Sequence, residues 1–220
     1  MATFESRAAR GVPAVEINKV LRNTYALLAM TLGFSAVTAS VSVAMGGPYL
    51  GWLTLIGFLG LMYGVHKTAD SVWGLPMTFL LTGFMGFSLG PILSAVLTTA
   101  NGGFLIAQAF ALTAVAFLAL SAYTISTKKD FSFLRGFLIV GFVVMIGAWI
   151  VSFFYWTPLL MQIMSVVAVM IGAALILWET SAVVRGEETN YIRATVGVYV
   201  GIYNMFSGLL AMLGMGFGDD

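Results

Sequence analysis

The sequence predicts an all-α integral membrane protein with seven transmembrane helices in a single membrane domain. Of its 220 residues, 60% are hydrophobic and only 9% are charged, whereas soluble domains carry about 25% charged residues. Seven apolar runs approach the length of about 20 residues that a helix needs to cross the hydrocarbon core. The basic residues fall in alternate links between these runs, as a chain that crosses a membrane repeatedly requires.

The composition also excludes several classes of function. The net charge of +1 offers no electrostatic footprint for nucleic acid, so we expect no nucleic-acid partner. The chain has no cysteine, which rules out a disulfide framework and a thiolate metal site. Its one histidine is His66. We therefore expect no catalytic centre, no metal site and no cofactor.

The chain starts with a polar segment, residues 1–23, ahead of the first apolar run. This segment contains Gly11, Pro13, scattered charges of both signs and few large apolar groups, so we expect a flexible tail. A signal peptide would place its apolar core within about the first 15–30 residues, but here the apolar run starts near Tyr25. We expect that run to be a retained first span of a membrane domain over residues 24–220.

The apolar runs are joined by short links, several of which contain Gly or Pro. The second run is short, and the seventh is unusually polar. The expected spans lie near residues 25–45, 50–66, 75–97, 104–125, 134–155, 159–183 and 192–213.

The placement of Lys and Arg predicts the orientation. The links near residues 46–49, 98–103 and 156–158 have no basic residue, so all ten Lys and Arg lie in the tail and the alternate links. The positive-inside rule makes that side cytoplasmic. Seven spans then put the N-terminus in the cytoplasm and the C-terminus, with Asp219 and Asp220, on the other side.

Glycines three or four residues apart recur in three of the expected spans. This spacing lets helix backbones approach closely in lipid, although glycine is also generally common in membrane helices. The residues are Gly57, Gly60 and Gly64, then Gly83, Gly86 and Gly90, then Gly197 and Gly201.

The third run contains Gly86, Ser88 and Gly90 in a G-x-S-x-G pattern, followed by Pro91. That pattern forms a nucleophile elbow only at a strand-to-helix turn, and here it lies inside an apolar span. His66 is expected near the cytoplasmic end of the second span, far from Ser88 in depth. We therefore expect packing glycines, a serine bonded to its own helix, and a break or kink at Pro91.

Glu179 is the ionisable residue that lies well inside an apolar run. Intramembrane acids usually serve a function, which makes Glu179 a candidate for gating or proton sensing, with His66 as a candidate partner at similar depth. Glu179 is expected only about 7 Å from the cytoplasmic end of its helix. A side chain that reaches the headgroups is therefore the alternative.

The seventh run carries polar residues, most of them four apart and so along one helix face. This face either lines a wet path or makes hydrogen bonds between helices. The residues are Thr195, Tyr199, Tyr203, Asn204 and Ser207.

These motifs together resemble the Bax inhibitor family, and the resemblance covers nearly the whole chain. The last two spans contribute most, the third-span G-x-S-x-G-P run adds to it, and the tail and the fourth link extend it. The matching segments are Trp178–Ser181, Glu187–Thr195, Tyr199, Tyr203–Phe206, Gly86–Pro91, Lys19–Tyr25, Ser121–Tyr123 and Lys128–Asp130.

The resemblance implies a bundle whose seventh helix is central within a ring of six. It also implies a bacterial inner-membrane protein without enzymatic activity, which binds the membrane protease FtsH and restrains its degradation of other membrane proteins. The alternative is a pH-sensitive cation leak, because calcium-leak members of the family carry an acidic pair on their last two spans. Glu179 matches the first acid, but Gly201 stands at the second position, which argues against a two-carboxylate calcium gate.

Overall fold

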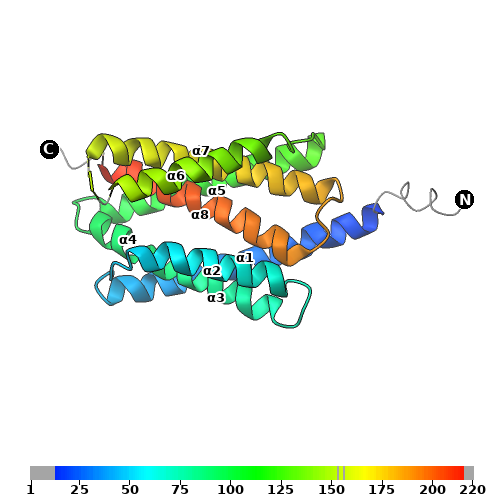
Figure 1. The fold of residues 1–220 in the computed structure, drawn as a ribbon, viewed down its shortest axis with the longest axis horizontal. Helices are drawn as coiled ribbons and strands as arrows, with labels where there is room; N and C mark the ends of the chain where they lie inside the picture. Colours follow the sequence, from blue (N-terminus) through cyan, green and yellow to red (C-terminus); the bar gives the residue numbers. More distant parts are fainter. Residues whose placement is uncertain (1–12, 153, 156, 216–220) are drawn as a thin grey trace, which may run out of the picture.

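The computed structural model describes residues 13–152, 154–155 and 157–215, and these residues form helices and connecting turns without a strand. The helices lie side by side in one elongated bundle (Figure 1). In chain order they are α1 (Ala14–Ala44), α2 (Trp52–Thr68), α3 (Gly74–Ser88), α4 (Gly90–Leu97), α5 (Gly102–Thr127), α6 (Leu134–Ser152), α7 (Pro158–Val184) and α8 (Tyr191–Met215).

Six helical segments are long and apolar enough to cross a membrane: α1, α3 together with α4, α5, α6, α7 and α8. The remaining helix, α2, corresponds to the short second run and has 17 residues. At 1.5 Å per residue it is about 25 Å long, less than the roughly 30 Å of a hydrocarbon core. The all-helical membrane fold is confirmed, and the count of seven spans stays a prediction.

Helix α1 begins at Ala14, directly after Pro13, whose fixed φ and missing N–H suit the start of a helix. Residues 14–23 are therefore helical, which corrects this part of the predicted flexible tail. The cause is tertiary packing, because Val20 is buried against Val183 of α7 and Ala194 of α8. The rest of the predicted tail, residues 1–12, lies outside the described residues.

The third predicted span is interrupted where the sequence predicts a break. Helix α3 ends at Ser88, and α4 begins at Gly90 with Pro91 in its first turn. Proline has no N–H to donate to the carbonyl four residues earlier, so the regular helical hydrogen bonding stops there.

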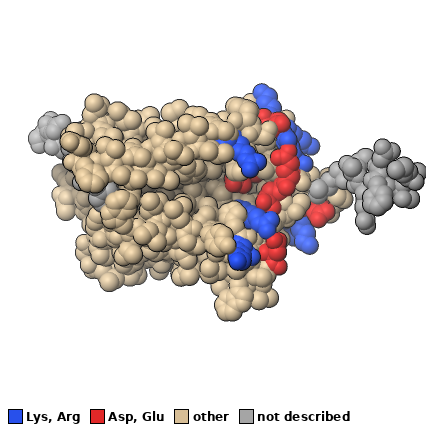
Figure 2. Space-filling view, viewed as in Figure 1, with Lys and Arg blue, Asp and Glu red and all other residues tan. Residues whose placement is uncertain are grey.

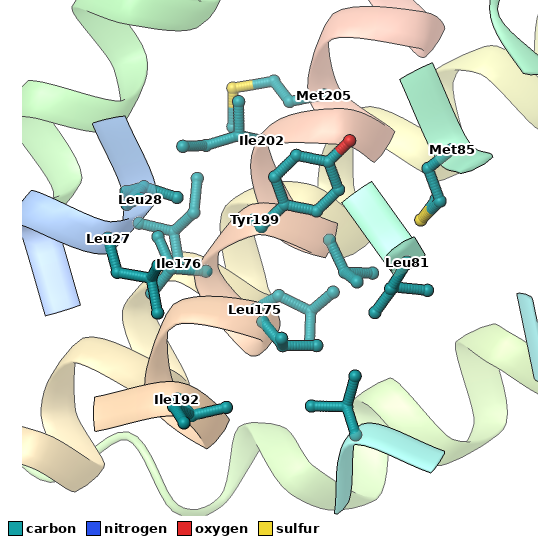
Figure 3. Packing of buried hydrophobic residues seen from close by; sticks show 14 of the residues in the cluster. Leu27, Leu28, Leu81, Met85, Leu175, Ile176, Ile192, Tyr199, Ile202 and Met205 are labelled. Carbon is teal, nitrogen blue, oxygen red and sulfur yellow. The ribbon is translucent and has the colours of Figure 1, made fainter. Parts of the chain in front are cut away.

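Helix α8 packs against α1, α2, α3, α4, α5 and α7. Its Tyr199 sits in the main hydrophobic cluster, among side chains from α1, α3 and α7 that include Leu28, Leu81 and Ile176 (Figure 3). Such extensive burial explains how this polar helix persists in the bundle, since its polar groups can find partners on several neighbours.

The described Lys and Arg side chains gather at one end of the molecule, which we call the basic end (Figure 2). Helix α1 begins at this end, and α8 ends at the opposite one (Figure 1). This segregation agrees with the alternation of basic and uncharged links in the sequence.

Candidate functional site: the α7–α8 hairpin

The carboxyl group of Glu179 lies between the last two helices. Glu179 is half-buried near the end of α7, and its Cδ and Oε1 lie directly against Gly197 of α8, where any side chain would collide with them. Within the described part of the chain, no hydrogen bond or ion pair joins Glu179 to another residue. Glycine at position 197 is therefore what lets this carboxyl group sit against the α8 backbone.

Glycines also set the close approach of α7 and α8 deeper in the bundle. A Cβ on Gly172 would lie 2.5 Å from the Gly201 carbonyl oxygen, and one on Gly201 would lie 2.9 Å from the Gly172 carbonyl oxygen. A Cβ on Gly208 would lie 2.6 Å from the Ser165 carbonyl oxygen. Small residues hold membrane helices together by this kind of backbone contact. Gly60 of α2, by contrast, has nothing within 4 Å of its would-be Cβ.

Tyr199 ties α8 to two other helices. Its hydroxyl donates to the Thr82 carbonyl oxygen at 3.1 Å and lies 2.7 Å from Ser35 Oγ. Because the phenol has a single proton and the carbonyl can only accept, Ser35 is the donor in the second bond. Tyr199 is 1% exposed, which favours a role in bonding helices together over a role in lining a wet path.

Two further residues on the polar face of α8, Thr195 and Tyr203, also bond to neighbouring helices. Thr195 Oγ1 lies 3.2 Å from the Thr24 carbonyl oxygen of α1 and 2.7 Å from that of Tyr191. Tyr203 donates to Ser88 Oγ at 3.0 Å, since Ser88 gives its own proton to the Met85 carbonyl oxygen at 2.7 Å. These residues join helices.

Asn204 and Ser207, on the same polar face of α8, make hydrogen bonds only within their own helix among the described residues. Asn204 Nδ2 donates to the Val200 carbonyl oxygen at 2.8 Å, and Ser207 Oγ donates to the Asn204 carbonyl oxygen at 3.2 Å. Both residues are half-buried, and both bonds stay within α8. The hydrogen bonds of Thr195, Tyr199 and Tyr203 thus favour interhelical bonding over a wet path for these three residues.

The third-span motif packs α3 and α4 against α1. A Cβ on Gly86 would meet the Ser35 carbonyl oxygen, and one on Gly90 would meet the Ser42 side chain. Ser88 is bonded to its own helix, as expected. These contacts give the motif a packing role and provide no strand-to-helix turn for a nucleophile.

His66 is exposed, and its Nδ1 lies 3.0 Å from the Met62 carbonyl oxygen of its own helix. No described contact joins it to Glu179, so the candidate pair is not formed in this structure. Among the described residues, no three His, Asp or Glu side chains gather into a set that could hold a metal ion.

At the basic end, polar contacts join the α7–α8 region to the two other loops, and we call this set of contacts the loop clasp. The sequence alone does not reveal it. Arg185, just after α7, forms ion pairs with Asp130 of the α5–α6 loop and with Glu187. Arg193 of α8 forms an ion pair with Asp70 of the α2–α3 loop. Residues in the link between α7 and α8 and at the start of α8 therefore contact the two other loops at this end.

Asn190 completes the loop clasp and starts α8. Its Nδ2 donates to the Ala69 carbonyl oxygen at 3.0 Å and to Asp70 Oδ1 at 2.7 Å. Its Oδ1 accepts from the backbone N–H of Ile192 at 2.8 Å and of Arg193 at 3.3 Å, which is the bonding of a helix N-cap. An Asn before an apolar run indicates the cap, but nothing local to it indicates the partners about 120 residues away.

A sequence model described as an inhibitor of apoptosis-promoting Bax1 matches residues 17–218. The chain belongs to the Bax inhibitor family. It is 46% identical over 203 residues, 92% of each chain, to an Escherichia coli K12 protein named modulator of FtsH protease YccA. The matching protein of E. coli O6:H1 is named an inner membrane protein. The present chain is also 50% identical over 206 residues, 93% of each chain, to a Pseudomonas aeruginosa protein. It is 43% identical over 208 residues, 94% of this chain and 93% of the other, to a Vibrio cholerae membrane protein.

In this member of the Bax inhibitor family, Gly201 occupies the position where a second acid would stand. Gly201 packs on the backbone of Gly172, and a Cβ there would also lie 2.9 Å from Ile176 Cγ1. A carboxylate at position 201 would have to push α7 and α8 apart. The space at position 201 is therefore filled by α7, and Glu179 lies against a different glycine, Gly197.

Proposed function

We propose that this Bax inhibitor family protein binds the membrane protease FtsH and restrains its degradation of other membrane proteins, without an enzymatic activity of its own. The observation that carries the proposal is the 46% identity to YccA across 92% of both chains. The hydroxyl groups of Ser88 and Tyr199 bond to carbonyl oxygens rather than to a general base, which supports the absence of an enzymatic activity.

We further infer that α2 crosses the membrane, which gives seven spans with α8 at the centre. A helix of 17 residues can span when the bilayer thins locally, at a cost of fractions of a kcal/mol per Å of mismatch. The basic end then lies in the cytoplasm of a bacterial cell, and the C-terminus in the periplasm. Helix α1, about 46 Å long at 31 residues, extends beyond the hydrocarbon core on the cytoplasmic side.

The alternative function is a cation leak. The geometry of the α7–α8 hairpin favours the leak less than it favours the restraint of a protease. A pair of acids cannot be completed at Gly201 without separating α7 from α8, since the Gly172 backbone fills that space. On the polar face of α8, Thr195 and Tyr199 already make hydrogen bonds to α1 and α3, so they are not free to line an ion path. A calcium flux into liposomes that contain this protein alone would support the leak.

The proposal is tested by reconstituting FtsH and a second membrane substrate in liposomes with and without this protein. We expect the protein to co-purify with the protease and to lengthen the half-life of the second substrate. Gly60→Val, at a position with open space, should act like the wild type, whereas Gly201→Val should lose both effects because its side chain meets the Gly172 carbonyl oxygen. An unchanged half-life with the wild-type protein would contradict the proposal.

A further inference from the structure

The bundle is open on one side, between α2 and α6. Among the described residues, α2 packs on α3 and α8, and the backbone of α6 comes close to that of α7 alone. Within the described residues, no Cα of α6 comes within 8 Å of a Cα of α2 or of α8. Figure 1 shows α8 running between α2 and the α6–α7 pair, and Figure 2 shows the same face hollowed along this line. We call this opening the lateral cleft; α2 and α6 are its walls and α8 is its floor.

Contacts at both ends close the lateral cleft. At the end opposite the basic end, the rings of Trp52 on α2 and Trp149 on α6 meet edge-to-face with centroids 4.8 Å apart. Beside them is a cavity of about 190 Å³, lined in part by Thr54, Ser88 and Trp149. At the basic end, the loop clasp holds the α2–α3 and α5–α6 loops. The opening therefore faces the hydrocarbon rather than either membrane surface.

The register of α8 shows which residues form the floor. At about 100° per residue, Gly197 and Gly201 turn toward α7, while Tyr199 and Tyr203 turn toward α1 and α3, as their contacts show. The arc between these two faces holds the residues at positions 200, 204, 207 and 211. Val200 on this arc is buried, whereas Asn204, Ser207 and Ala211 are half-buried and form the floor.

Asn204 leaves a polar group open to the lateral cleft. Its Nδ2 is bonded to the Val200 carbonyl oxygen, whereas no described hydrogen bond reaches its Oδ1. Asn204 follows the start of α8 by 13 residues, or about 20 Å, which is near the middle of the roughly 30 Å hydrocarbon core. Lipid tails offer no donor at that depth, and a polar group left unsatisfied in hydrocarbon costs several kcal/mol.

We propose that the lateral cleft is a docking site for one transmembrane helix of another protein, which places a hydrogen-bond donor on Asn204 Oδ1. The donor is a Ser, Thr, Asn or Gln side chain at mid-span of the partner helix. The small residues Ser207 and Ala211 beside Asn204 let the partner backbone come close. The identity of the partner as the FtsH protease rests on the proposed function; the place and chemistry of docking rest on the cleft.

The test uses the absence of cysteine from the chain. Ser207→Cys and a matched Leu112→Cys, on the exposed side of α5 where Leu112 is 46% exposed, are each labelled with a benzophenone maleimide in membranes that contain FtsH. We expect light to produce a covalent adduct with the protease from position 207 and none from position 112. Co-purification of the wild-type protein with FtsH, combined with an adduct from position 112 alone, would overturn the docking site and leave the proposed function intact.

A second variant tests the hydrogen bond itself. Asn204→Leu keeps the side-chain size and removes the amide, so we expect protease affinity to fall roughly three- to twenty-fold. Asn204→Gln retains an amide and should restore much of the loss, and an unchanged thermal midpoint for all three proteins would show that they fold alike. Equal affinity of Asn204→Leu and the wild type would contradict the proposal. Failure of the wild-type protein to co-purify at all would reject both this proposal and the proposed function.

Discussion

At the residue scale, Tyr199 shows how a polar group is stabilised in a membrane bundle. Its hydroxyl bonds to Ser35 of α1 and to the Thr82 carbonyl oxygen of α3, so one side chain joins three helices. Its ring packs among apolar residues such as Leu81 and Ile176. The same residue thus contributes both apolar burial and interhelical hydrogen bonds.

Tyr199→Phe removes these bonds and keeps the ring. We expect a loss of about 1–2 kcal/mol in the free energy of unfolding in detergent, because single interhelical bonds in membrane proteins contribute roughly 0.6–1.7 kcal/mol. Tyr123→Phe is the control, since the Tyr123 hydroxyl accepts only an exposed bond from Lys129 Nζ. Equal stability of the two variants would show that the buried bonds contribute nothing beyond packing.

Glu179 supplies a second prediction at this scale. Glu179→Gln should insert and function nearly as the wild type, because the amide fits the same contact with Gly197. Glu179→Lys should lower the folded yield, since it presses a cation against the α8 backbone inside the bundle. The measurements are the yield of folded protein in membranes and the half-life of a second FtsH substrate. If both variants matched the wild type, Glu179 would merely reach toward the headgroups.

At the element scale, glycine contacts decide which helices meet closely. Helix α3 touches α1 through Gly86, and α4 touches α1 through Gly90. The break at Leu89 between α3 and α4 leaves both glycines facing α1. The G-x-S-x-G-P run is thus explained by packing of a broken helix, with Ser88 also accepting from Tyr203.

Gly86→Ala tests this contact. Its Cβ would meet the Ser35 carbonyl oxygen and Thr38 Oγ1, so we expect a loss of about 1–3 kcal/mol, as for other overpacked sites. Gly60→Ala is the matched control, with nothing within 4 Å of the added carbon, and should be neutral or slightly stabilising. Thermal unfolding of both variants in the same detergent measures the difference. Equal midpoints for Gly86→Ala and Gly60→Ala would refute the packing role.

At the scale of the whole molecule, the charged side chains of the described residues gather at one end of the bundle. Helix α1 starts at the charged end, and α8 finishes at the other. Six crossings would return the chain to the side where it began, so α2 decides the topology.

A reporter that is active only outside the cytoplasm, fused after Asp220, tests this arrangement. We expect an active fusion, because seven crossings carry the C-terminus to the periplasm. The same reporter placed in the α5–α6 loop after Lys129 should be inactive, since that loop lies at the basic end. A stable, inserted but inactive fusion after Asp220 would overturn the seven-span topology.

The amino-acid sequence alone was enough to predict the all-helical membrane class, the approximate positions of the helices, the break near Pro91 and the segregation of basic residues, because hydropathy, proline chemistry and charge act locally along the chain. It also singled out the polar residues of α8. Only the tertiary structure shows which partners these residues bond to, where α1 begins and how the loop clasp forms. The bond from Tyr199 to Ser35 spans 164 positions and the one from Asn190 to Asp70 spans 120. Helix packing determines which of these distant residues become partners, and no local pattern in the sequence predicts it.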